Sequence, residues 1–472
     1  MEAGERIERA ASEVFGFGEL RPGQAEAVGH VLDGRDTLAV MSTGYGKSAI
    51  YQIAALLIPG PTVVVSPLIA LQAEQVEELE SEDAGGAAAV SSFVAAGARR
   101  EALEELAEGE LEFLFLSPEQ LSNEEVLADV TAARPSLFVV DEAHCISEWG
   151  HDFRPDYLKL GAVVEAVGRP PVLALTATAS PPVRHEIVER LRMRSPEIIV
   201  RGFDRPEIWL GVEHFHAERA KREALLSQVA DEPKPGIVYA ATRRLAEELA
   251  GELVLRGVSA VAYHAGMSRA SRTAAQEGFM ADEVDVVVAT TAFGMGVDKP
   301  NVRFVFHSEP ADSVDSYYQE IGRGGRDRAA ARAVLFYRVE DLGLRRFFAG
   351  GGSDEHHREI ERSRVEMMGA YAESSGCRRE FVLTYFGERF SPPCGNCDNC
   401  QAGLVTASDG DAATRPFAEG TRVAHERWGE GTVQRYEEGA LVVLFESVGY
   451  KKLGLDMVLE RGLLASVGGK PR

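Results

Sequence analysis

Short apolar runs rich in β-branched residues alternate with longer helical patterns along most of this chain. A first series of runs lies before residue 200, and a second series lies between residues 207 and 340. The runs are Leu38–Met41, Thr62–Ser66, Leu137–Val140 and Val172–Leu175 in the first series, and Gly236–Tyr239, Ala260–Tyr263, Val284–Ala289 and Arg303–His307 in the second. Such alternation is typical of parallel sheets flanked by helices. The sequence therefore predicts an α/β protein with two sheet-containing lobes and a cleft between them.

The charge and hydropathy of the chain limit its location and partners. The formal net charge is -24, which ordinarily counts against nucleic-acid binding because Lys and Arg supply the affinity for phosphates. Much of the acidity lies in two helix-like runs, residues 74–82 and 101–112, which can be solvated faces remote from a basic groove. The longest apolar stretch, residues 54–71, is interrupted by prolines and a glycine, and the first twenty residues lack a signal-peptide core. We expect no membrane span and a cytoplasmic protein.

A glycine-rich turn follows the first apolar run and precedes a helical pattern. In such a turn backbone amides approach phosphate, the lysine reaches the β- and γ-phosphates, and the hydroxyl ligates Mg²⁺. The residues predicted to hold ATP here are Thr43, Gly44, Gly46, Lys47 and Ser48. Met41 stands where the general pattern has its first glycine, so an ordinary strand-to-helix turn is the alternative.

Two carboxylates directly follow the buried run Leu137–Val140. Because the carboxyl ends of parallel strands meet at one edge of a sheet, Asp141 and Glu142 are expected near the phosphate loop. Asp141 is predicted to hold Mg²⁺ through its waters, and Glu142 to polarise the attacking water. The alternative is a solvated acidic start of a helix.

Two arginines flanked by glycines lie in the second lobe. Phosphoryl transfer needs a cation that stabilises the charge developing on the transferred group. Arg326 is predicted to supply this cation and Arg323 to support it. The alternative is that both arginines are surface ion-pair partners of Glu320 and Asp327.

Four of the five cysteines are clustered near residue 390. Cys377, Cys394, Cys397 and Cys400 offer four soft thiolates, which suit a tetrahedral zinc ion. An iron–sulfur cluster is the competing interpretation, whereas disulfides do not suit a reducing cytoplasm. Cys145 is left over and is interpreted as a small buried hydrophobe.

Taken in order, these motifs resemble the RecQ family of superfamily-two helicases over about residues 1–403. The segments that carry the resemblance are Phe15–Phe17, Arg21–Gln24, Ser66–Leu68, Asp141–Pro155, Thr176–Thr178, Tyr263–Gly266, Ala292–Pro300 and Gln319–Asp327. The resemblance implies two RecA-like lobes at residues 1–204 and 205–345. It also implies a helical zinc-binding module at residues 346–403.

The same resemblance implies roles for residues outside the phosphate loop. Adenine contacts are expected from Phe17, Arg21 and Gln24, since the amide can donate to and accept from a base edge; core packing is the alternative for Phe17. Contact with DNA, and its coupling to hydrolysis, is expected from Ser66, Trp149, Phe153, Arg154, Thr176 and Thr178. Trp149 and Phe153 would stack unpaired bases, and because their loop begins at the carboxylate pair, bound DNA would affect Glu142.

The residues after the zinc module depart from longer RecQ proteins, because a winged helix does not fit them. Residues 404–415 are polar and are predicted to be a linker. Residues 416–466 contain Phe417–His425 and Trp428–Val433 and resemble the Tudor-like tail of UvrD/PcrA-type helicases. The expected fold is a small SH3/Tudor-like β-barrel. It would dock a protein partner from the transcription or repair machinery, with DNA holding as the alternative.

The function implied by the resemblance is a 3′-to-5′ DNA helicase of repair or recombination. It would use ATP, Mg²⁺ and Zn²⁺ and act on single-stranded and forked DNA. Three alternatives remain open at this point. They are a DNA-dependent translocase or strand-annealing remodeller with weak unwinding, a tethering protein whose motor is secondary, and a DEAH-type RNA helicase.

Overall fold

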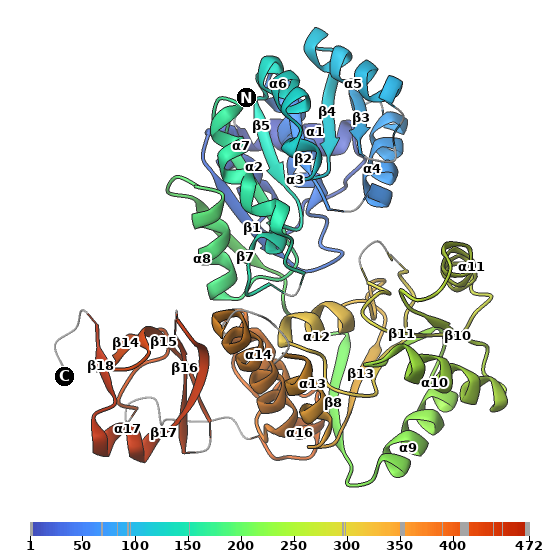
Figure 1. The fold of residues 1–472 in the computed structure, drawn as a ribbon, viewed down its shortest axis with the longest axis vertical. Helices are drawn as coiled ribbons and strands as arrows, with labels where there is room; N and C mark the ends of the chain where they lie inside the picture. The colour runs from blue at the N-terminus through green and yellow to red at the C-terminus, as the bar shows by residue number, and fades with distance from the viewer. Residues whose placement is uncertain are drawn as a thin grey trace. The chain divides into compact units, whose positions relative to one another are not determined.

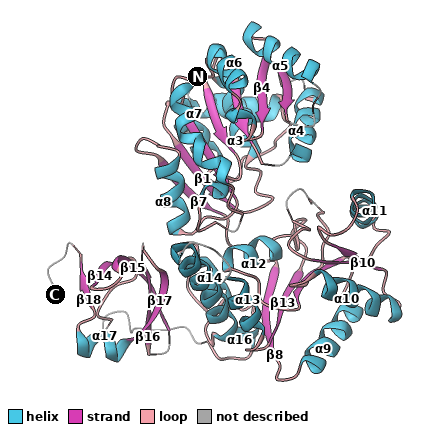
Figure 2. Ribbon diagram, viewed as in Figure 1, coloured by secondary structure: helices cyan, strands magenta, loops and turns pink. Residues whose placement is uncertain are grey.

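The fold consists of two compact units, residues 1–203 and residues 204–472 (Figure 1). The computed structural model describes residues 3–467 except 68, 83, 92–93, 95, 151, 295–296, 298, 350–354, 389, 406–414, 438 and 446. Figure 2 shows helices flanking the parallel sheet of each unit. Among the described residues, none of the helices combines the length and the apolar character needed to cross a bilayer.

The first unit is built on a seven-stranded parallel sheet with the order β3-β4-β2-β5-β6-β1-β7. Its strands are β1 (Thr37–Met41), β2 (Thr62–Val65), β3 (Gly86–Val90), β4 (Leu111–Leu116), β5 (Leu137–Val140), β6 (Val172–Thr176) and β7 (Glu197–Arg201). Every residue of β1, β2, β5 and β6 is buried, as expected for strands covered on both faces. These are the four strands that the first series of apolar runs predicts.

Helices of the first unit include two amphipathic ones that carry much of the acidity. The helices are α1 (Ala3–Glu13), α2 (Gln24–Leu32), α3 (Ser48–Leu57), α4 (Ile69–Ser81), α5 (Ala96–Glu108), α6 (Glu124–Ala133), α7 (Leu160–Ala166) and α8 (Pro181–Arg190). In α4 and α5, Leu79, Leu103 and Leu106 are buried while most of the glutamates are exposed. The acidic runs are therefore largely solvated faces, as the sequence predicts.

The second unit contains a six-stranded parallel sheet with the order β10-β11-β9-β12-β13-β8. Its strands are β8 (Ile208–His214), β9 (Gly236–Tyr239), β10 (Ala260–Tyr263), β11 (Val286–Ala289), β12 (Phe304–His307) and β13 (Ala331–Tyr337). The helices between them are α9 (Glu218–Asp231), α10 (Arg243–Leu255), α11 (Arg269–Met280) and α12 (Val314–Ile321). The second predicted lobe is thereby confirmed as a parallel α/β structure.

A helical segment and a small antiparallel sheet complete the second unit. The helices are α13 (Asp341–Ala349), α14 (Glu355–Glu373), α15 (Arg378–Tyr385) and α16 (Asp398–Gln401). The sheet, with the order β17-β16-β15-β14-β18, consists of β14 (Arg422–His425), β15 (Gly429–Glu437), β16 (Ala440–Phe445), β17 (Gly449–Gly454) and β18 (Leu464–Ser466). Helix α17 (Leu455–Arg461) lies between β17 and β18 in the chain. The predicted linker at residues 404–415 lies largely outside the described residues.

Candidate functional site

The phosphate loop connects the buried strand β1 to helix α3. Gly44 and Gly46 have φ values of 75° and 79°, a region that glycine adopts without the steric cost of a Cβ atom. Nζ of Lys47 lies 3.1 Å from the carbonyl oxygen of Met41 and 3.5 Å from that of Ser42. The lysine therefore points back across the loop, and Ser48 begins helix α3 directly after it.

Gln24 and Arg21 bind the same loop from the start of α2. Nε2 of Gln24 donates to the carbonyl oxygens of Gly46 at 2.7 Å and Tyr45 at 3.1 Å, while its Oε1 accepts from the amide of Arg21 at 2.7 Å. Arg21 donates to the carbonyl of Gly44. A Cβ atom on Gly46 would lie 3.0 Å from Nε2 of Gln24. The structure thus brings two of the three predicted adenine contacts against the phosphate loop.

Phe17, the third predicted adenine contact, is partly buried. Its ring stacks on that of Phe15 with centroids 5.6 Å apart and an interplanar angle of 19°. It also packs against the hydrophobic core of the first unit. In this conformation the Phe17 ring packs in the core, which was the alternative to adenine contact.

Asp141 and Glu142 lie at the carboxyl end of β5, where the sequence places them. Burial, followed by the neighbouring Glu142 carboxylate, raises the pKa of Asp141 to about 7, and the positive charge of Lys47 opposes this shift. The influence of Lys47 shows that the carboxylate pair and the phosphate loop share one site. Glu142 has φ and ψ of 46°, a left-handed conformation that is uncommon for a residue with a side chain and that often marks functional sites.

His144 joins this carboxylate pair to the end of strand β6. Its Nδ1 lies 3.2 Å from Oε2 of Glu142 and 2.9 Å from Oγ1 of Thr176. The Thr176 hydroxyl donates to the carbonyl of Thr178 at 3.0 Å. Burial disfavours the charged imidazole, but Cys145 and Glu142 together raise the pKa of His144 well above its usual value. The predicted coupling residues Thr176 and Thr178 therefore contact the carboxylate site through a histidine.

Cys145 joins the same histidine to the aromatic-rich loop, residues 146–155. Its Sγ lies 3.8 Å from Nε2 of His144 and 3.7 Å from Oδ2 of Asp152. The Asp152 carboxylate accepts from Nε and Nη2 of Arg154, both at 3.1 Å. Arg154 also donates to the carbonyl of Pro67 at 3.0 Å. A continuous polar chain thus runs from Glu142 to the loop predicted to touch DNA, and Cys145, which is buried as predicted, also takes part in it.

The two aromatic residues of that loop differ in exposure. Trp149 is only 7% exposed, and its amide donates to the hydroxyl of Ser147 at 3.1 Å, whereas Phe153 is partly exposed. A Cβ atom on Gly150 would lie 2.3 Å from the carbonyl oxygen of His144, so only glycine fits there. In this conformation Phe153 offers a stacking face, and the ring of Trp149 packs inside the protein. Ser66, another predicted DNA contact, is fully buried.

Arg323 and Arg326 lie just after helix α12 in the second unit. Both donate to the carbonyl oxygen of Val297, Arg323 at 3.4 Å and Arg326 at 3.1 Å. Arg323 is 6% exposed, so it is not the surface residue that the alternative interpretation requires. The carboxylates proposed as their partners bind elsewhere, Glu320 to His307 at 2.7 Å and Asp327 to Arg303 at 2.5 Å.

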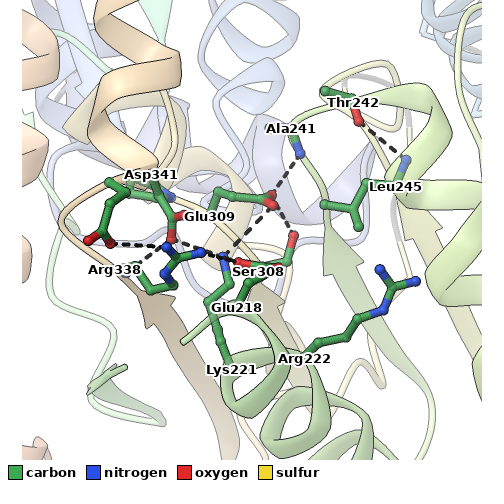
Figure 3. A network of polar contacts seen from close by, with 12 residues as sticks. Glu218, Lys221, Arg222, Ala241, Thr242, Leu245, Ser308, Glu309, Arg338 and Asp341 are labelled. Carbon is green, nitrogen blue, oxygen red and sulfur yellow. Dashed lines mark hydrogen bonds and ion pairs between the residues drawn. The ribbon is translucent and has the colours of Figure 1, made fainter. Parts of the chain in front are cut away.

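A buried lysine that the sequence did not single out connects the second sheet to the helical segment (Figure 3). Lys221 is 2% exposed, and its Nζ lies 2.9 Å from Asp341 at the start of α13 and 3.1 Å from Glu218. A third carboxylate, that of Glu309, lies 4.0 Å from Nζ of Lys221. Glu309 also accepts a hydrogen bond from the backbone amide of Ala241 at 3.0 Å. Nothing in the local sequence separates Lys221 from a surface residue of α9, because its partners come from other elements.

The four clustered cysteines converge around one point. Their Sγ atoms all lie within 4.8 Å of one another, and those of Cys394 and Cys400 are 3.8 Å apart. A tetrahedron of Zn–S bonds of about 2.3 Å has edges of about 3.8 Å. Cys377 and Cys397 are the N-cap residues of α15 and α16. The geometry fits a single zinc ion that would hold these two short helices together.

Three family models match consecutive parts of the chain. A DEAD/DEAH box helicase model matches residues 21–187, a helicase conserved C-terminal domain model matches residues 220–328, and a RecQ zinc-binding model matches residues 339–401. The fold and the site therefore define a protein of the DEAD/DEAH box helicase class that carries a RecQ-type zinc-binding module.

Similar proteins narrow the class further. The ATP-dependent DNA helicase RecQ of Haemophilus influenzae is 41% identical over 389 residues, which are 82% of this chain and 62% of that protein. The probable ATP-dependent DNA helicase RecS of Bacillus subtilis is 33% identical over 457 residues, with 84% of this chain and 92% of that protein covered. This chain belongs to the RecQ family of helicases. It spans 62% and 61% of the length of the RecQ proteins of H. influenzae and Pasteurella multocida.

Solved structures confirm the fold of the two lobes. The helicase Lhr of Mycobacterium smegmatis superposes with a TM-score of 0.55 at 22% identity, covering 74% of this chain and 50% of that chain. The DEAD-box helicase Mss116 superposes with a TM-score of 0.56 at 16% identity, covering 81% and 88%. The predicted pair of RecA-like lobes is confirmed. The likeness of residues 416–466 to a Tudor-like tail stays a prediction, although an antiparallel sheet forms there.

Proposed function

We propose that this chain is an ATP-driven DNA helicase that moves 3′ to 5′ along single-stranded DNA and unwinds duplex DNA. The observation that carries the proposal is the polar chain from Glu142 through His144, Cys145 and Asp152 to Arg154. It links a site suited to phosphoryl transfer to a loop with a partly exposed Phe153. The names of the relatives as DNA helicases support DNA over RNA as the track.

Each residue of the phosphoryl-transfer site has a proposed role. Lys47 and the amides of the phosphate loop bind the β- and γ-phosphates, with Gln24 reaching the adenine once ATP displaces its loop contacts. Glu142 accepts the proton of the attacking water. Arg323 and Arg326 leave the Val297 carbonyl to stabilise charge on the transferred phosphoryl group. Mg²⁺, with Ser48 and Asp141 as its proposed ligands, would neutralise phosphate charge.

Zinc is proposed as a structural ion of the helical segment. The four thiols have the separations of a single tetrahedral site, and a multi-iron cluster would bind them to separate irons. Free thiols also suit a reducing compartment, so the cytoplasm stays the proposed location. A protein partner for residues 416–466 is proposed on the exposed Met457 and Leu459 of α17, since exposed apolar side chains favour contact sites.

A second candidate is a translocase or strand-annealing protein with weak unwinding. One observation favours this candidate. The described residues after the zinc-binding segment form an antiparallel sheet, and not the winged helix with which longer RecQ proteins separate a duplex. Both candidates share the ATP site and differ only in what the motor does to DNA.

Strand displacement decides between the candidates. Forked and tailed duplexes of both polarities should be offered to the wild type and to Glu142→Gln, with ATP hydrolysis followed in parallel with single-stranded DNA and RNA. We expect unwinding of 3′-tailed substrates and loss of hydrolysis by about 10²-fold or more in the variant. Hydrolysis without strand displacement would favour the second candidate. Wild-type turnover in Glu142→Gln would overturn the assignment of the site.

A further inference from the structure

The C-terminal sheet is bound to the zinc-binding segment through one buried serine. Ser363 of α14 is fully buried, and its hydroxyl accepts from the amide of Tyr450 at 2.8 Å and donates to the carbonyl of Tyr450 at 3.3 Å. Tyr450 belongs to β17, an edge strand of the sheet. One hydroxyl therefore satisfies both backbone groups of an edge residue, a role that a neighbouring strand ordinarily fills.

Side chains extend this interface to helix α15. The rings of Tyr450 and Tyr385 stack with centroids 5.2 Å apart and an interplanar angle of 26°. The guanidinium of Arg435, on β15, lies 3.8 Å from the centre of the Phe381 ring. Tyr385, Tyr450, Phe381 and Arg435 are all less than 9% exposed. Burial of this extent distinguishes the contact from two domains joined only by a linker.

The residues that hold the sheet also hold helix α12. The hydroxyl of Tyr385 donates to the carboxylate of Asp315, which is 2% exposed in the first turn of α12. Arg364, next to Ser363, donates to the hydroxyl of Ser313 at 3.3 Å. Ser313 is the N-cap of α12 and accepts from the amide of Ser316 at 3.0 Å. The C-terminal sheet and the start of α12 are thus held by neighbouring residues of α14, Ser363 and Arg364. Tyr385 of α15 contacts both the sheet and α12.

Helix α12 leads directly to the arginine pair. It ends at Ile321, Gly322 caps it, and the amide of Arg323 donates to the carbonyl of Glu320 at 3.2 Å. A short helix transmits a shift at its start to its end, because its backbone hydrogen bonds keep it rigid. The position of Arg323 and Arg326 therefore depends on what holds Asp315 and Ser313.

We propose that the C-terminal sheet positions the arginine pair through Tyr450, Tyr385 and Asp315, so that the tail is a working part of the motor. Tyr385 is a positioning residue: it touches neither nucleotide nor DNA and acts through α12. The proposal rests on the proposed function, because it assigns Arg323 and Arg326 to phosphoryl transfer.

The test compares full-length variants that differ in one hydroxyl. Tyr385→Phe removes the bond to Asp315 and keeps the ring that stacks on Tyr450. Tyr337→Phe is the matched control, since its hydroxyl also donates to a carboxylate, that of Glu373 at 2.7 Å, at the far end of α14. Binding of a fluorescent ADP analogue counts the folded sites in each preparation, which separates a positioning effect from loss of folded protein.

We expect Tyr385→Phe to lower kcat for DNA-stimulated ATP hydrolysis about tenfold and to leave KM for ATP unchanged. A tenfold effect corresponds to the loss of about one charge-assisted hydrogen bond. Tyr337→Phe should keep kcat within about twofold of the wild type, because the bond that it loses, to Glu373, does not hold α12. Tyr450→Ala should lower kcat in the wild type and add little in the Tyr385→Phe background, because both changes act on one path.

Three outcomes would count against the proposal, and they are distinct. Equal kcat values for Tyr385→Phe, Tyr337→Phe and the wild type would overturn it while leaving the proposed function intact, provided that Glu142→Gln is inactive in the same assay. Absence of any Glu142-dependent turnover in the wild type would overturn the proposed function and the positioning role together. Additive effects of Tyr450→Ala and Tyr385→Phe would overturn the shared path.

Discussion

At the scale of single residues, Asp152 connects the proposed ATP site to the loop proposed to bind DNA. Its carboxylate accepts from Arg154 and from the thiol of Cys145, which in turn contacts His144. A DNA phosphate that binds Arg154 would compete with Asp152 and the Pro67 carbonyl for its guanidinium. DNA binding would therefore release Asp152 and disturb the polar chain that ends at Glu142.

Asp152→Asn should weaken the coupling between DNA and hydrolysis. The amide keeps the size of the side chain but loses the charge that binds Arg154, so stimulation by single-stranded DNA should fall about fivefold to tenfold. The measurement is the ratio of the hydrolysis rates with and without DNA. Asp156→Asn is the control, because Asp156 pairs with the exposed Lys159 at 3.1 Å. An unchanged ratio in Asp152→Asn would show that the polar chain carries no coupling.

Glu112 of β4 should make the stability of the protein depend on pH. Burial raises its pKa from 4.5 to about 7, and its Oε1 has no hydrogen-bond partner among the described residues. Between about pH 4.5 and 7 the folded state keeps a proton that the unfolded state has lost. The free energy of unfolding should therefore fall as pH rises through this window and level off above it.

Glu112→Gln should remove this contribution. Urea unfolding at pH 5 and pH 8 should show the variant stabilised relative to the wild type at pH 8 and little changed at pH 5. Glu108→Gln, an exposed position of α5, serves as the control. A difference between variant and wild type that is the same at both pH values would exclude titration of Glu112 as the cause.

Sequence reasoning could place the residues of the proposed ATP site near one another because their positions follow from the chain nearby. Lys47 and Asp141 each come just after a buried strand, so their place at the sheet edge follows from the strand alone. The contacts of Gln24 could not be predicted in the same way, since an amide binds an adenine edge and a backbone carbonyl with the same chemistry. The polar chain from His144 to Arg154 could not be predicted either, because it depends on the directions of side chains in a loop.

At the scale of elements, the strands that the apolar runs missed have identifiable reasons. β3 has the sequence GAAAV, which lacks the β-branched residues that favour strands. β4 begins in a stretch that reads as an acidic helix, and β7 is only partly buried at the sheet edge. β8 and β13 lie outside the predicted runs, and they pair with each other along their whole length. Hydrogen bonding to neighbouring strands, rather than local preference, fixes these strands.

The zinc-binding segment should depend on its metal. Cys397→Ser should reduce bound zinc from about one ion per chain to well below that value, since three thiolates and a hydroxyl make a poorer site. Hydrogen exchange should then increase in α15 and α16, whose N-caps are two of the ligands. Cys145→Ala is the control and should keep its zinc. Full zinc content in Cys397→Ser would contradict the four-cysteine site.

At the scale of the whole molecule, the net charge of -24 coexists with a proposed DNA track because the charge is unevenly placed. Exposed glutamates of α4 and α5 carry part of the acidity, while Arg154, the arginine proposed to contact DNA, lies on the aromatic-rich loop. Total charge governs solubility and long-range repulsion, whereas local basic residues such as Arg154 would govern the proposed DNA contact. A sequence-wide sum could not have revealed this division.

Edge strands of β-sheets carry a hazard, because their unpaired backbone groups can recruit strands from other molecules. In this chain β17 is such an edge, and at Tyr450 the Ser363 hydroxyl occupies both backbone groups. The contact that ties the C-terminal sheet to α14 thereby also caps the sheet. If α14 released it, β17 would become a template for intermolecular pairing, so attachment of the tail also protects the protein against aggregation.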